Sequence, residues 1–164
     1  MISFNNLGNL GRLANQMFQY ASLKGIARNR GYDFCIPPSQ LFGQRDPLVK
    51  KDTLNIYDVF GVHKNNTIQT LANPVLQERT HEFDEELFRS CPDNVDLFGY
   101  YQSPKYFDHI KDEIKSDFSF SQEVEALCSE MFESIQDGKK VIALHIRRTD
   151  YTVNPNHPVQ PMEY

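Results

Sequence analysis

Along the first part of the chain, short apolar runs typical of strands flank a segment in which apolar residues recur at helical spacing. This pattern predicts an α/β fold. Short apolar runs at 2–4 and 33–36 predict strands. Between them, helical spacing of apolar residues predicts a helix over 13–30 that ends at Gly31. Its inward positions are Leu13, Met17, Tyr20, Ala21 and Ala27. Gly25 lies inside this helix and indicates a close packing contact, since glycine is otherwise unfavourable there.

The second half of the chain continues with further strands and helices. Residues 54–60 and 67–71 predict short elements, and 96–101 predicts another strand. Pro104 suits the first position of a helix, with Ser103 as its cap. The order of elements throughout is that of an α/β domain with a parallel sheet.

The clearest amphipathic helix is predicted over 119–136, where Ser119 and Gln122 fit a capping box. Its apolar positions recur at helical spacing and form one stripe, which we expect to belong to the core. The stripe consists of Val124, Leu127, Cys128, Met131 and Ile135.

The apolar run 141–146 predicts a buried strand, and Arg147 and Arg148 follow it directly. Ligands bind at the carboxyl ends of strands in open α/β sheets, and two guanidinium groups there suit a phosphate. The predicted ligand is therefore anionic, with a nucleoside diphosphate as the first candidate. The alternative is a solvated turn paired with Asp150. His145 is either a ligand contact or a hydrogen-bonded structural residue.

The predicted strand at 141–146 is followed by no crossover helix and no parallel neighbour. We therefore expect the chain to be the first part of a longer protein. Residues 1–137 would form a Rossmann-like domain, and 138–164 would begin a second domain.

A second group of polar residues surrounds the start of the predicted helix 13–30. Arg12, Asn15 and Gln16 follow a loop that contains Gly8 and Gly11. Free backbone N–H groups at a helix start favour anions, and Asn15 could read a sugar hydroxyl. The glycine spacing does not match the dinucleotide-binding fingerprint. The alternative is an ordinary loop with a capping asparagine.

Composition narrows the class of protein. The chain has 164 residues, of which 40% are hydrophobic and 24% charged, as in a soluble globular domain. Its formal charge of −5 argues against a nucleic-acid partner. No signal peptide or membrane span is recognised, so we expect a cytoplasmic protein, with peripheral membrane association left open. Cys35, Cys91 and Cys128 are widely spaced and predict neither a disulfide framework nor a metal site.

Three segments resemble motifs of one enzyme family, the α-1,2-fucosyltransferases of glycosyltransferase family 11. GRLANQMFQYA at 11–21 resembles the family's GRLGNQMFQYA, and HIRRTDY at 145–151 resembles its H-x-R-R-x-D-Y. LFGYYQSPKYF at 97–107 resembles the G-Y-F-Q-S-x-K-Y-F stretch. The three segments occur in the family's order and together span nearly all of the chain.

The resemblance implies a GT-B fold, in which two Rossmann-like domains face a cleft. It implies inverting transfer of L-fucose from GDP-fucose to the 2-hydroxyl of a galactoside in a glycan, without a metal or other cofactor. Arg147 and Arg148 would take the role of the motif arginines, one of them binding the GDP β-phosphate. Arg12 and Asn15 would line the cleft from the first domain. Fixed guanidinium groups neutralise the charge that builds on a departing diphosphate.

The sequence departs from the family in places. Ala14 stands where the family usually has glycine. Thr149 stands where many bacterial members have glycine, although related fucosyltransferases carry threonine there. The chain is also much shorter than family members. An inverting transferase needs a base for the acceptor hydroxyl, and Asp150 and His157 are the nearby candidates. The alternatives are a base in the part of the enzyme beyond these residues, and a late proton transfer with little assistance. The alternatives to an enzyme are a non-catalytic module that binds an anion or nucleotide sugar, and an inactive truncated product.

Overall fold

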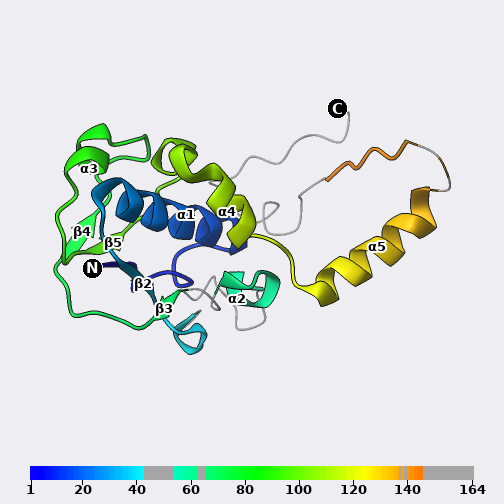
Figure 1. The fold of residues 1–164 in the computed structure, drawn as a ribbon, viewed down its shortest axis with the longest axis horizontal. Helices are drawn as coiled ribbons and strands as arrows, with labels where there is room; N and C mark the ends of the chain where they lie inside the picture. The colour runs from blue at the N-terminus through cyan, green and yellow to red at the C-terminus, as the bar shows by residue number, and fades with distance from the viewer. Residues whose placement is uncertain (43–53, 63–65, 137, 139, 146–164) are drawn as a thin grey trace, which may run out of the picture. The chain divides into compact units, whose positions relative to one another are not determined.

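The computed structural model describes residues 1–42, 54–62, 66–136, 138 and 140–145 (Figure 1). The chain divides into two compact units, Met1–Glu125 and Ala126–Tyr164, which are described separately below. Among the described helices, none combines the length and the apolar character that a membrane crossing requires.

The first unit is built on a parallel sheet of five short strands, in the order β3-β2-β1-β5-β4. The strands are β1 (Ile2–Ser3), β2 (Phe34–Ile36), β3 (Thr67–Ile68), β4 (Val75–Gln77) and β5 (Asp96–Phe98). At the centre, Ser3 pairs with Cys35 on one side and with Asp96 on the other. The α/β class and the parallel sheet are as the sequence predicts.

The two faces of the sheet differ in character. Ser3, Cys35 and Asp96 share one face, because paired residues of parallel strands point the same way. Ser3 donates its hydroxyl to the Asp96 carboxylate at 2.9 Å. The opposite face is apolar and packs against helix α1 (Leu13–Arg30), whose Tyr20 ring meets that of Phe34 at a centroid distance of 6.3 Å.

Helix α1 forms over the predicted residues and ends at Gly31, which takes the left-handed conformation with φ 68°. Most of its second half is buried on all sides, since it lies between the sheet and the segments that follow β4 and β5. A Cβ atom at Gly25 would lie 2.1 Å from the carbonyl oxygen of Tyr106. The close contact predicted at Gly25 is therefore confirmed.

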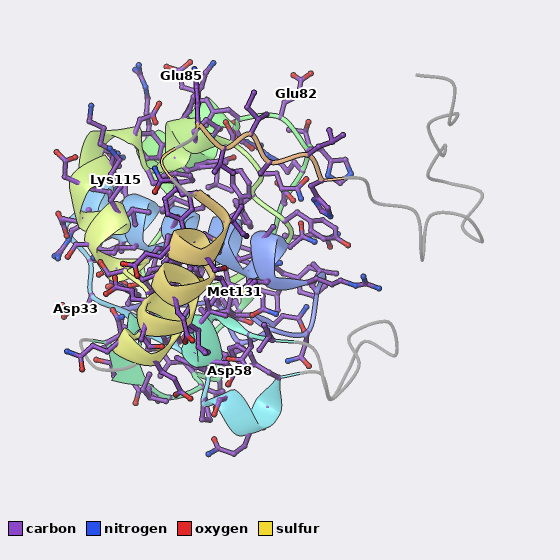
Figure 2. All side chains as sticks on the ribbon, turned by 90° about the vertical axis from the view of Figure 1, so that its right-hand side faces the viewer. Asp33, Asp58, Glu82, Glu85, Lys115 and Met131 are labelled. Atoms are coloured by element: carbon purple, nitrogen blue, oxygen red, sulfur yellow. The ribbon has the colours of Figure 1, made fainter. Side chains whose placement is uncertain are left out.

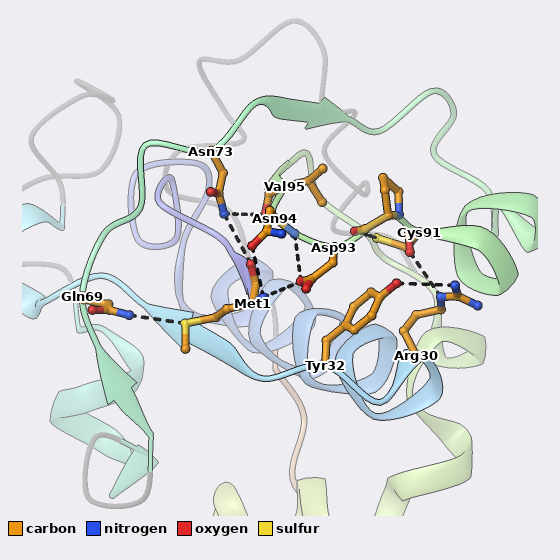
Figure 3. A network of polar contacts seen from close by, with 10 residues as sticks. Met1, Arg30, Tyr32, Gln69, Asn73, Cys91, Asp93, Asn94 and Val95 are labelled. Carbon is orange, nitrogen blue, oxygen red and sulfur yellow. Dashed lines mark hydrogen bonds and ion pairs between the residues drawn. The ribbon is translucent and has the colours of Figure 1, made fainter.

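The connection between β3 and β4 must pass from one edge of the sheet to the other, and it does so beside the start of β1 (Figure 3). Gln69 donates to the sulfur of Met1 at 3.3 Å, and Asn73 donates to the Met1 carbonyl at 3.4 Å. Asn73 also lies 3.5 Å from the Val95 carbonyl, and the Met1 amino group pairs with Asp93. Side-chain amides thus tie the crossing segment to the centre of the sheet.

The remaining helices among the described residues of the first unit are short. They are α2 (Ile56–Val59), α3 (Glu85–Ser90), the 3₁₀ turns η1 (Ser39–Leu41), η3 (Pro104–Tyr106) and η4 (Asp108–Ile110), and α4 (Lys111–Asp117). Pro104 starts a 3₁₀ turn and not an α-helix, and Ser103 makes no side-chain cap. Charged side chains such as Glu82, Glu85 and Lys115 are exposed at the outside of this unit (Figure 2).

Helix α5 (Gln122–Gln136) corrects two predictions. Its cap is Ser121 and not Ser119, since the Val124 N–H lies 3.4 Å from the Ser121 hydroxyl. Its apolar stripe is not core: Leu127, Met131 and Ile135 are 58%, 63% and 60% exposed, and Cys128 is exposed too (Figure 2). An amphipathic pattern indicates that a face needs an apolar partner, but does not supply that partner.

The strand predicted at 141–146 is not formed over its described part, 141–145. These five residues have no regular secondary structure and are exposed, with Ile142 85% and Leu144 83% accessible. A strand persists only when a neighbour pairs its backbone groups, and none of the described strands pairs with this segment.

Candidate functional site

The candidate site lies at the carboxyl edge of the sheet, where the loops that follow β1 and β5 meet the start of α1. Strands β1 and β5 are adjacent and parallel, so the chain leaves both at the same edge. The loop after β1 contains Gly8 and Gly11, and the loop after β5 is the turn 99–103. This edge is where open α/β sheets bind ligands.

Three side chains of α1 bind the turn 99–103. Gln102 donates its amide N–H to the side-chain oxygen of Asn15. Gln19 donates to the carbonyls of Leu10 at 3.0 Å and Gly99 at 3.1 Å, and so bridges the two loops. Ser22 donates to the Tyr101 carbonyl at 3.0 Å. The segments 11–21 and 97–107, which carry two of the three motifs, are therefore joined by hydrogen bonds.

The glycine loop closes over the first turn of α1. Gly11 has φ 79°, a left-handed conformation that glycine tolerates best, and a Cβ there would lie 2.2 Å from the Asn15 amide nitrogen. The backbone at Gly11 therefore packs directly on Asn15. This contact limits the directions in which Asn15 can point.

The three residues predicted at the helix start lie in different surroundings. Arg12 is exposed and precedes the first helical residue, while Asn15 is half-buried beside Gln102. Gln16 is only 1% exposed, and its side-chain oxygen accepts the N–H of Ile56, the first residue of α2, at 3.2 Å. Gln16 thus holds α2 against α1, and the binding roles of all three residues stay predictions.

The turn 99–103 has an unusual backbone. Tyr101 has φ 51°, a left-handed conformation that costs a non-glycine residue about 1–2 kcal/mol. Glu78 stabilises this conformation, because its two carboxylate oxygens accept the N–H groups of Tyr100 at 2.7 Å and Tyr101 at 2.9 Å. Nothing in the local sequence indicates this role of Glu78. It directly follows the neighbouring strand β4 and lies 22 and 23 residues before its partners.

Tyr101 itself is fully buried, and its hydroxyl donates to the Leu76 carbonyl at 3.3 Å. Burial, together with the negative charge of Glu78, raises the pKa of the Tyr101 hydroxyl well above its ordinary value. The hydroxyl therefore stays protonated near neutral pH. Tyr101 is a packing residue of the turn and not an acid or base.

The described part of the site offers amides, backbone N–H groups and one guanidinium. Asn15 and Gln102 each carry both a donor and an acceptor, which suits the hydroxyl groups of a sugar. Arg12 and the start of an 18-residue helix favour a negative group nearby. Among the described residues, no group of three or more His, Cys, Asp or Glu side chains is placed to hold a metal ion.

The other predicted site residues lie in the second unit or outside the described residues. His145 is exposed in the second unit. Arg147, Arg148 and Asp150 lie outside the described residues, as does His157. Their roles stay predictions.

Comparison with known proteins gives one consistent result. The chain is 28% identical over 153 residues to galactoside alpha-(1,2)-fucosyltransferase 2 of Sus scrofa, covering 90% of this chain and 42% of that protein. The Bos taurus protein of the same name gives the same values. Galactoside 2-alpha-L-fucosyltransferase SEC1 of Bos taurus is 27% identical over 146 residues, which is 86% of this chain and 37% of that protein. No family model and no solved structure matches.

The chain thus spans about two fifths of the length of these curated relatives, from 37% to 42%. The similarity runs along most of the chain and so includes more than the three short motifs. It confirms that this chain resembles the α-1,2-fucosyltransferases, over the part of those proteins that it covers.

Proposed function

We propose that this chain carries the first Rossmann-like domain of an inverting α-1,2-fucosyltransferase with the GT-B fold. The enzyme would transfer L-fucose from GDP-fucose to the 2-hydroxyl of a galactoside. The observation that supports this most is the similarity to galactoside fucosyltransferases along about 90% of the chain. The hydrogen bond between Asn15 and Gln102 supports it further, because it joins two of the motif segments at the ligand-binding edge.

In this proposal the first domain forms the acceptor side of the cleft. Asn15 and Gln102 are the described amides that would bind galactoside hydroxyls. Arg12 is exposed at the same edge and would contact the donor's phosphates or the acceptor. Hydrogen bonding to several hydroxyls would orient the galactose ring, so that its 2-hydroxyl faces the fucose.

The donor would be held by the second domain, which begins within 138–164. Arg147 and Arg148 would grip the diphosphate, and His145 would lie beside it. Breaking the bond from fucose to the β-phosphate leaves negative charge on the phosphate oxygens, which a guanidinium stabilises in place. Asp150 is our candidate to take the proton from the attacking hydroxyl, a role that general-base catalysis requires.

The test is a transfer assay on the complete gene product with GDP-fucose and a β-galactoside. The matched control acceptor is the 2-deoxy-β-galactoside, which lacks the one hydroxyl that should accept fucose. We expect an α-1,2-linked product with the first acceptor, none with the second, and no loss of rate with EDTA. Transfer to the 2-deoxy acceptor, or none to either acceptor, would contradict the proposal.

A further inference from the structure

Glu78 holds the strained turn of the candidate site from the neighbouring strand. It directly follows β4, and its own N–H donates to the Phe98 carbonyl at 2.8 Å, which continues the pairing of β4 with β5. Its carboxylate then reaches over the end of β5 and accepts two consecutive N–H groups, those of Tyr100 and Tyr101. One side chain thus fixes the direction of the chain as it leaves the sheet.

The backbone of the turn is shaped to fit this carboxylate. Two consecutive N–H groups that face one anion form a concave backbone site of the kind that binds anions. The turn contains two residues with positive φ, Gly99 with φ 152° and Tyr101 with φ 51°. A Cβ atom at Gly99 would lie 2.4 Å from the Cβ of Glu78, so the glycine leaves room for the carboxylate to approach.

The other described contacts of the turn do not replace Glu78. Gln19 and Ser22 of α1 bind the carbonyl oxygens of Gly99 and Tyr101. Glu78 binds the N–H groups of Tyr100 and Tyr101, the first of which belongs to the same peptide as the Gly99 carbonyl. Without the carboxylate, two N–H groups would lose their acceptor while the backbone strain at Tyr101 remained.

The residue that depends on this turn is Gln102, which follows Tyr101 directly and is exposed at the site. We infer that Glu78 is a positioning residue for acceptor binding: its carboxylate fixes the turn 99–103, so that Gln102 and Asn15 present their amides to the hydroxyls of a galactoside. This inference rests on the proposed function and deepens it, since it names a residue that decides affinity for the sugar acceptor without touching it.

The test is the Glu78→Gln variant of the complete gene product, with Glu82→Gln as the matched control. Both changes remove one negative charge from the same segment, but Glu82 is exposed. We expect Glu78→Gln to raise the acceptor KM about tenfold, the effect of losing a hydrogen bond of about 1.4 kcal/mol, while the GDP-fucose KM stays unchanged. A purely structural role would lower the amount of active enzyme, and so kcat, without moving the acceptor KM.

Two further measurements separate positioning from folding. In the Gln102→Ala background, Glu78→Gln should raise the acceptor KM by less than threefold, because the residue that it positions is already gone. Amide hydrogen exchange should become faster at Tyr100 and Tyr101 and stay unchanged in α1. Additive effects of the two substitutions, or unchanged exchange at the turn, would overturn the inference.

The failures of the two proposals can be told apart. If the wild-type protein transfers fucose and Glu78→Gln keeps the normal acceptor KM, the role of Glu78 is wrong and the proposed function stands. If the wild-type protein transfers no fucose, the proposed function fails, and the acceptor role of Glu78 fails with it.

Discussion

Replacing Gly25 by alanine tests the contact that joins α1 to the turn η3. Gly25 lies inside α1, and a Cβ atom there would lie 2.1 Å from the Tyr106 carbonyl oxygen and 2.9 Å from the Cα of Phe107. These neighbours are backbone atoms, so no change of side-chain rotamer relieves the clash. The helix and the turn would have to move apart by about an ångström to reach ordinary contact distances.

Two opposing effects decide whether Gly25→Ala raises or lowers the free energy of unfolding. Alanine favours a helix interior over glycine by about 1 kcal/mol. Overpacking a tight interior costs about 1–3 kcal/mol, and a contact between backbones belongs at the upper end of this range. We therefore expect Gly25→Ala to lower the free energy of unfolding by about 2 kcal/mol.

The chain has no tryptophan whose fluorescence could report unfolding. Urea unfolding is therefore followed by far-UV circular dichroism, which gives the free energy of unfolding. The control is Gly31→Ala, where a Cβ meets nothing within 4 Å but φ is 68°. That variant should lose only the left-handed preference, about 1 kcal/mol. If Gly25→Ala proves as stable as the wild type, or more stable, the close contact does not exist and the reasoning is refuted.

Three other predictions follow from the site and the fold. In the complete gene product, replacing whichever of Arg147 and Arg148 binds the phosphate by alanine should lower kcat about 10²- to 10³-fold, and lysine there should restore little activity. Normal transfer by both alanine variants would exclude the phosphate-binding role. The hydrogen bond from the Leu87 N–H and, to a smaller extent, the ion pair with Arg79 lower the pKa of Asp84. The ionised Asp84 carboxylate therefore stabilises the fold above about pH 4, and this stabilisation is lost as the pH falls through the lowered pKa. Asp84→Ala should therefore cost about 1–2 kcal/mol at pH 7 and much less at pH 2 in urea unfolding, and an equal cost at both would contradict this. Calorimetry of the chain alone with GDP should show weak binding or none, and micromolar affinity would be evidence against the proposal that the donor site needs more of the second domain than residues 138–164.

The parts of the fold that the sequence predicts are those with strong local signals. Helix α1 forms as predicted over 13–30, because regular apolar spacing and Gly31 determine a helix and its end locally. Strand β4 and helix α3 are not predicted, since three and six residues are too few to show a period. Residues 85–90 also lack the apolar spacing of a longer helix.

The errors concern burial, which depends on contacts between distant parts of the chain. The apolar stripe of α5 predicts a core helix, but Met131 is 63% exposed, because a pattern cannot show what covers it. In the site, Asn15 and Gln16 have similar chemistry and adjacent positions, yet one lies beside Gln102 and the other is buried beneath α2. Their different environments follow from the helix turning by about 100° per residue relative to its neighbours. Glu78 escapes sequence reasoning because its partners lie in the turn after another strand, 22 and 23 residues along the chain.

The central claim is tested most directly by a transfer assay with GDP-fucose and a β-galactoside that determines the linkage of the product. The assay uses the wild-type complete gene product and its Asn15→Ala variant, and also gives the acceptor KM of each. The account predicts a fucose on the galactose 2-hydroxyl with the wild type, and an acceptor KM raised about tenfold in the variant, as for loss of one hydrogen bond to the sugar. A product linked through another hydroxyl, or an acceptor KM unchanged by Asn15→Ala, would contradict it.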